Sequence, residues 1–86
     1  TGVACERLFE AFERRCVLSG ETLGVSDACF LTFEPHLPKS PDNCVLVSMS
    51  ARRTVGVEMT HFNWSTEQRA LIVAAQVKFQ IAEQNT

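Results

Sequence analysis

The C-terminal segment of this chain predicts a helix with apolar residues on two sides, which is more than a small domain readily buries. A helix advances about 100° per residue, and on that projection the apolar and small residues between Thr66 and Glu83 occupy roughly 260° of the circumference. One apolar arc contains Ala70, Val73, Ala74, Val77 and Ile81. A second arc contains Leu71, Ile72, Ala75, Phe79 and Ala82. The remaining polar stripe is narrow.

A chain of 86 residues builds one core and buries only about 60–65% of its unfolded surface. We therefore interpret residues 1–86 as a single domain, and as a fragment of a longer protein because the chain starts at Thr1 without a methionine. Two interpretations of the last helix stay open. In the first interpretation, the helix at the start of the chain covers more of the last helix than expected. In the second, the second arc is a protein-binding surface centred on Ile72, Ala75 and Phe79.

The rest of the chain predicts one further helix and three strands. Apolar residues recur at helical spacing over residues 3–18, and Gly20 stands where a helix commonly ends. Residues 28–34 and 44–50 alternate as strands do. Residues 51–53 read as a turn with Arg52 and Arg53 at its tip, and Val55, Val57 and Met59 continue as a third strand.

A capping box opens the last helix, because Ser65 is followed three residues later by Gln68. The expected fold is therefore α+β, with the order α-β-β-β-α. We expect a three-stranded antiparallel sheet with two helices packed on one face, since alternating strands leave the other face to solvent or a partner.

Composition argues against several classes of protein. The formal charge is −2, whereas domains that bind nucleic acid usually carry a basic excess, so nucleic acid is a disfavoured partner. No apolar run approaches the ~20 residues that cross a bilayer, so no membrane association is expected. Cys5, Cys16, Cys29 and Cys44 have apolar neighbours, which favours reduced core thiols in an intracellular protein, cytoplasmic or nuclear. Disulfides in a secreted protein are the alternative.

The sequence offers little for catalysis or metal binding. His36 and His61 do not stand at the spacing of zinc ligands, and Cys29 or Cys44 with His61 has no motif-grade arrangement for nucleophilic catalysis. We therefore expect no enzyme activity, no bound metal and no cofactor. The prolines at every third position of residues 35–41 could form a polyproline II ligand, and a stiff loop between strands explains them equally well.

The expected element order, the Arg52-Arg53 turn and the passage into Ser65-Thr66-Glu67-Gln68-Arg69-Ala70 together resemble a double-stranded-RNA-binding domain. The element order is also similar to the Alu-domain pair of the signal recognition particle, whose members are strongly basic RNA binders. In the first family the last helix typically begins with a lysine cluster that grips phosphates. Here those positions hold Thr66, Glu67 and Gln68, which resembles a degenerate copy used for dimerisation or protein docking.

We therefore expect a noncatalytic protein-interaction or dimerisation module. Its partner is another protein or a second copy of the chain, and the expected contact residues are Leu71, Ile72, Ala75, Phe79 and Ala82. The alternative is binding of double-stranded RNA through Arg52, Arg53 and Arg69.

Overall fold

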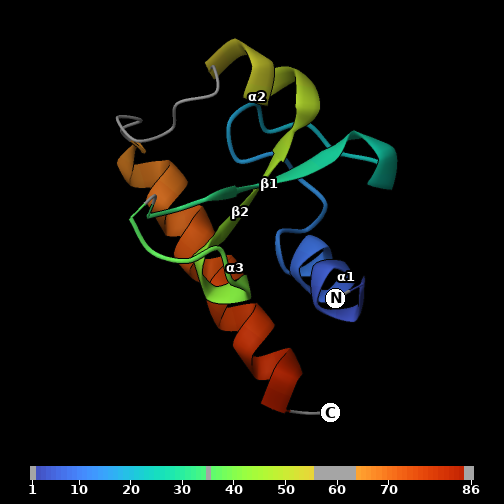
Figure 1. Cartoon of the computed structure of the whole chain (residues 1–86), viewed down its shortest axis with the longest axis vertical. Helices are drawn as coiled ribbons and strands as arrows, with labels where there is room; N and C mark the ends of the chain where they lie inside the picture. Colours follow the sequence, from blue (N-terminus) through green and yellow to red (C-terminus); the bar gives the residue numbers. More distant parts are fainter. Residues whose placement is uncertain (1, 35, 56–63, 85–86) are drawn as a thin grey trace.

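A computed structural model describes residues 2–34, 36–55 and 64–84 (Figure 1). Its elements follow the order α-β-β-α-α, with two short 3-10 turns. They are α1 (Gly2–Ala11), η1 (Val25–Asp27), β1 (Ala28–Thr32), η2 (Pro41–Asn43), β2 (Cys44–Ser48), α2 (Met49–Val55) and α3 (Thr66–Gln84). The fold is thus α+β, and the described residues contain a two-stranded antiparallel sheet with three helices. The predicted three-stranded sheet is wrong.

The first helix ends well before the predicted residue 18 because the chain turns sharply after Phe12. The amide of Arg14 donates to the carbonyl of Phe9 at 3.1 Å, and the amide of Glu13 donates to that of Glu10 at 2.9 Å. These two bonds form a Schellman motif, with Glu13 at φ 57° in the left-handed position that glycine usually takes. Gly20 does have a positive φ of 79°, but it closes a later turn, in which its amide donates to Cys16.

The chain after α1 doubles back and supports the second edge of β2. An isolated antiparallel bridge joins Arg15 to Thr22. The amide of Val17 donates to the carbonyl of Leu46 at 3.0 Å, which places this turn beside β2. Residues that were predicted to extend a helix therefore supply an edge contact for the sheet.

The two strands pair as expected, but the sheet is not open on one side. β1 and β2 are antiparallel, with Ala28 opposite Ser48 and Thr32 opposite Cys44. Every residue of β2 is buried, including neighbours that point to opposite faces of the sheet. The expectation that alternate residues leave one face to solvent is therefore wrong for β2.

Helix α2 occupies the place where a hairpin turn was predicted. The Oγ of Ser48 accepts a hydrogen bond from the amide of Ala51 at 3.0 Å, so Ser48 ends β2 and acts as the N-cap of α2. Arg52 and Arg53 lie in the last turn of this helix and not at a hairpin tip. Of the predicted third strand, Val55 belongs to α2, while Val57 and Met59 lie outside the described residues.

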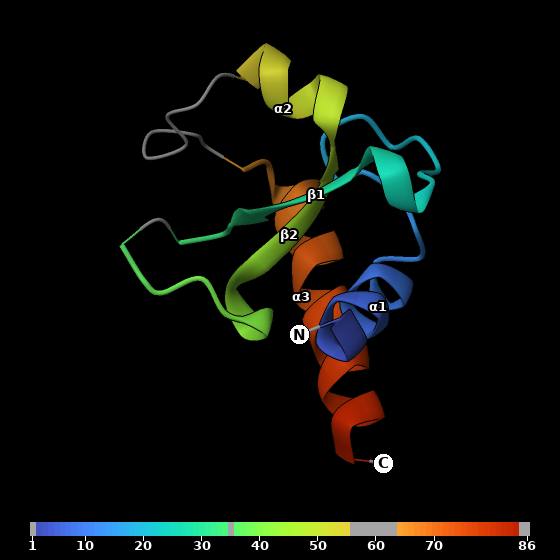
Figure 2. The same cartoon turned by 45° about the vertical axis from the view of Figure 1, so that its right-hand side comes forward.

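The prediction for α3 is confirmed. The amide of Gln68 donates to Ser65 Oγ at 3.0 Å, and the amide of Ser65 donates to Gln68 Oε1 at 2.8 Å. This reciprocal pair is the predicted capping box. Figure 2 shows α3 running behind both strands with α1 beside its C-terminal half. The core lies between these elements and includes Leu8, Phe12, Leu31, Val45, Leu46, Val47, Trp64, Ile72 and Phe79.

One buried amide holds the loop between the strands. Asn43 Nδ2 donates to the carbonyl oxygens of Glu34 and Pro38 at 3.1 Å, and to that of Leu37 at 3.4 Å. Asn43 Oδ1 accepts from the amide of Glu34 at 2.9 Å. The loop curls around this side chain, so its described residues do not form a straight polyproline ligand.

We expect Asn43→Asp to lower the free energy of unfolding by ~2–3 kcal/mol, because it removes the two amide protons and sets a carboxylate against carbonyl oxygens. Urea denaturation followed by circular dichroism measures the change. Lys39→Ala, an exposed substitution in the same loop, is the matched control and should change stability by less than about 0.5 kcal/mol. Equal effects of the two substitutions would contradict this role of Asn43.

Candidate functional site

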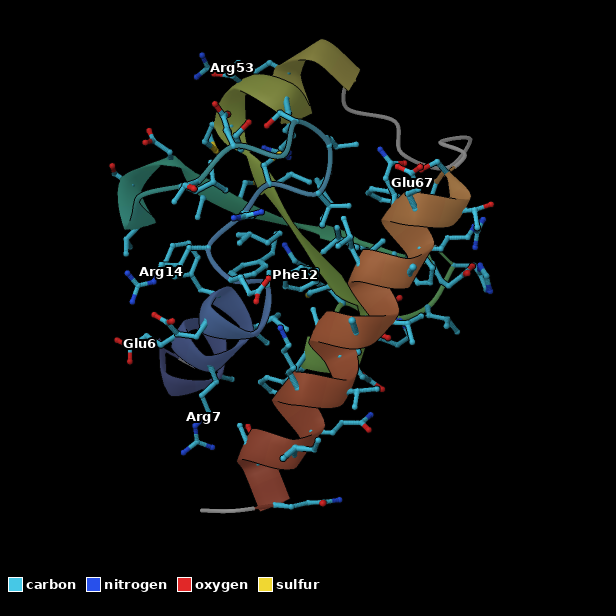
Figure 3. All side chains as sticks on the ribbon, turned by 180° about the vertical axis from the view of Figure 1, so that it is seen from behind. Glu6, Arg7, Phe12, Arg14, Arg53 and Glu67 are labelled. Atoms are coloured by element: carbon cyan, nitrogen blue, oxygen red, sulfur yellow. The ribbon has the colours of Figure 1, made fainter. Side chains whose placement is uncertain are left out.

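The side of α3 that faces away from the core is an apolar strip, which we call the outer face. It consists of Ala70, Val73, Ala74, Val77 and Ile81. Val73 and Ile81 are each 52% exposed and Val77 is 49% exposed, while both alanines are also exposed. Figure 3 views the molecule from the side of α3, and α3 is the element nearest the viewer. The outer face is therefore available for contact along several turns of helix.

The opposite side of α3 carries the residues expected to form the centre of the interface. Ile72 is 0% exposed, Ala75 2% and Phe79 7%, and all three belong to the hydrophobic core. In this structure a partner cannot reach them without unfolding the chain. The chain itself therefore covers these three residues, and the other arc is the uncovered one.

The two other expected contact residues lie on the flank of α3 that turns toward α1. Leu71 is exposed and lines a cavity of about 160 Å³ together with Phe12 and Cys16. Ala82 lines a shallower hollow beside Glu6 and Arg7 of α1. Of the five expected contact residues, Leu71 and Ala82 are therefore exposed, whereas Ile72, Ala75 and Phe79 are buried in the core.

Two ion pairs join α3 to the N-terminal part of the chain. Lys78 Nζ lies 3.1 Å from Glu13 Oε1, and Arg7 Nη1 lies 3.1 Å from Glu83 Oε2. These side chains are partly exposed, so each pair contributes little energy, about 0–1 kcal/mol. Both pairs lie outside the outer face, whose five residues carry no charge.

The three arginines of the alternative RNA site belong to different parts of the fold. Arg52 and Arg53 are exposed on α2, and Figure 3 shows Arg53 pointing away from α3. Arg69 Nε donates to the carbonyl of Trp64 at 3.3 Å, and its guanidinium carbon lies 5.7 Å from the centre of the Phe33 ring. Glu67 stands at the exposed start of α3. The arrangement lacks a continuous basic patch among these residues.

The cysteines are free thiols in unlike environments. Cys16 and Cys44 are buried, Cys29 is half-buried, and Cys5 is exposed, which differs from the expectation that all four lie in the core. Burial raises the pKa of the Cys16 thiol, but hydrogen bonds from Ser19 and Ser48 outweigh that effect and hold its pKa below the ordinary value. The amides of both serines lie within 3.3 Å of the Cys16 sulfur. Burial raises the pKa of Cys44.

The described residues contain no group of three or more histidine, cysteine, aspartate or glutamate side chains arranged to hold a metal ion. His36 is exposed and lies 3.8 Å from Glu34, while His61 falls outside the described residues. Cys16 is only 2% exposed. Within residues 2–34, 36–55 and 64–84, no helix has the length and apolarity required to cross a membrane.

Comparison of the chain with protein-family models, with curated proteins and with solved structures found no match. The functional argument therefore depends on the surface of the molecule itself. The most distinctive part of that surface is the outer face of α3.

The two sides of α3 predict opposite results for the same chemical change. We expect Phe79→Asp to unfold the domain or to cost more than about 4 kcal/mol, because it buries a charge in the core. We expect Val77→Asp, two residues away on the outer face, to change stability by less than about 1 kcal/mol. Urea denaturation of both variants measures the difference. A loss of stability in Val77→Asp as large as in Phe79→Asp would show that the outer face is covered by the chain itself.

Proposed function

We propose that this protein is a noncatalytic interaction module whose outer face on α3 binds another protein surface. The observation that carries the proposal is the row of half-exposed Val73, Val77 and Ile81 on the side of α3 opposite the core. A helix that faces only solvent usually carries polar residues on that side. Contiguous apolar surface on a small protein is typical of a contact site.

The energies are of the right size for reversible binding. Covering a half-exposed valine or isoleucine contributes about 1 kcal/mol, and small residues such as Ala70 and Ala74 let a partner approach closely. These gains must offset the loss of rotational and translational freedom on association. A single helix face therefore supports a weak to moderate complex.

Binding of double-stranded RNA has less support. Such binding depends mainly on cations that contact phosphates, and Glu67 is an acidic residue at the start of α3. Arg69, the cation nearest to it in sequence, contacts Phe33 and Trp64 within the chain. No feature of the described residues favours this function over protein binding.

A photo-cross-linking experiment tests the proposal. The protein is expressed in its own cells with a benzophenone amino acid at Val77, or at Val25 as the matched control, since Val25 is an apolar residue of η1 that is 82% exposed. We expect a protein adduct from position 77, none from position 25, and loss of the adduct when Val73→Asp is added. An adduct with any protein, including a second copy, supports the proposal. Equal or absent adducts at both positions would overturn it.

A further inference from the structure

We propose that the occupant of the outer face is a second copy of the chain, whose α3 lies antiparallel across a two-fold axis near Val73 and Ala74. This inference depends on the proposed function, since it names the partner for the same surface. It follows from the sizes of the residues in the outer face and from the charges that border it. Symmetric pairing of one patch with itself is also the commonest way in which proteins form dimers.

The residue sizes favour the antiparallel arrangement. Along the outer face the small residues Ala70 and Ala74 lie mainly toward the start of the helix, and Val77 and Ile81 lie toward its end. An antiparallel copy places each Ala70 opposite Val77, and beside the two-fold axis Val73 meets Val73 on one flank and Ala74 meets Ala74 on the other. The small Ala70 then faces the larger Val77 at both ends of the contact, which permits close packing there. A parallel copy would place alanine against alanine at one end and leave a gap there.

The charges at the border are complementary in the same arrangement. Glu67 and Lys78 project from one flank of α3, about 20° apart around the helix. Antiparallel helices bring like flanks together, so each Glu67 lies within about 3 Å, along the helix axis, of Lys78 in the second copy. The two Lys78 residues remain about 13 Å apart along the axis. Two attractive pairs therefore form, and like charges stay separate.

Lys78 can make this contact without giving up its partner within the chain. Its ammonium lies 3.1 Å from Glu13, yet 52% of the side chain is exposed. A lysine ammonium has three donors, so one can reach a second carboxylate. In the dimer Lys78 would lie between Glu13 of its own chain and Glu67 of the other.

The size of the contact sets the expected affinity. α3 has 19 residues and is thus about 28 Å long, so two copies form an interface at the lower end of the range for specific complexes. Figure 3 shows that the sheet lies behind α3, so a second copy approaching from the viewer's side meets α3 first. We therefore expect a reversible dimer in the micromolar range.

Sedimentation equilibrium on the purified chain tests the pairing. We expect a monomer–dimer equilibrium that Val77→Asp abolishes and that Val25→Asp leaves unchanged. Glu67→Lys should raise the dimer Kd about tenfold, because both ion pairs become repulsive. The double variant Glu67→Lys/Lys78→Glu should restore most of the affinity, despite the loss of the pair with Glu13. Failure of the second charge change to restore affinity would overturn the antiparallel arrangement.

A disulfide test reports the orientation directly. Variants Ala70→Cys and Val77→Cys carry tags of different size and are oxidised with copper phenanthroline, either alone or mixed. Antiparallel pairing predicts that the mixed disulfide forms at least about tenfold faster than either self-disulfide, with the unsubstituted chain as background. Faster self-disulfides would indicate parallel helices and would overturn the proposal. A strict monomer whose position 77 still cross-links to another protein in cells would overturn the second copy alone and leave the proposed function standing.

Discussion

Burial of one strip of α3 in the hydrophobic core determines most of this structure. Ile72, Ala75 and Phe79 are nearly inaccessible to solvent, and each large side chain contributes about 1.5–3 kcal/mol when it is fully buried. Because a helix turns by about 100° per residue, burying this strip fixes which residues point the opposite way. The outer face around Val77 is therefore a geometric consequence of the core contact.

A two-stranded sheet is too small to be stable without support, and here the support comes from irregular chain. The turn after α1 covers the second edge of β2, where Val17 donates to Leu46 and Cys16 Sγ accepts from the amide of Ser48. At the end of the sheet where the loop joins the two strands, the Asn43 side chain forms hydrogen bonds with backbone groups of that loop. The backbone of Val17 and the side chain of Cys16 thus make bonds to this edge of β2 that a third strand would have made.

The sequence predicted the elements whose determinants are local. Ser65 and Gln68 define the start of α3, and alternating β-branched residues define β2. The end of α1 could not be read in this way, because Glu13 adopts a left-handed conformation for which glycine is the usual sign. Helix α2 had a visible cap in Ser48, but residues 45–49 and 55–59 also match the alternation of a hairpin. The sequence around residue 50 is therefore compatible with both a helix and a hairpin, and the structure contains the helix.

The sequence pattern likewise could not show which of the two arcs of α3 would be buried in the core, since both arcs are apolar. Packing volume explains the outcome, because Ile72 and Phe79 fill the core better than the alanines and valines of the other arc would. Small residues left outside have a further consequence. They lose little side-chain entropy on contact, and no core residue depends on them. In the proposed complex, folding and association are then separate events, so the domain would be stable as a single chain and would still bind reversibly through α3.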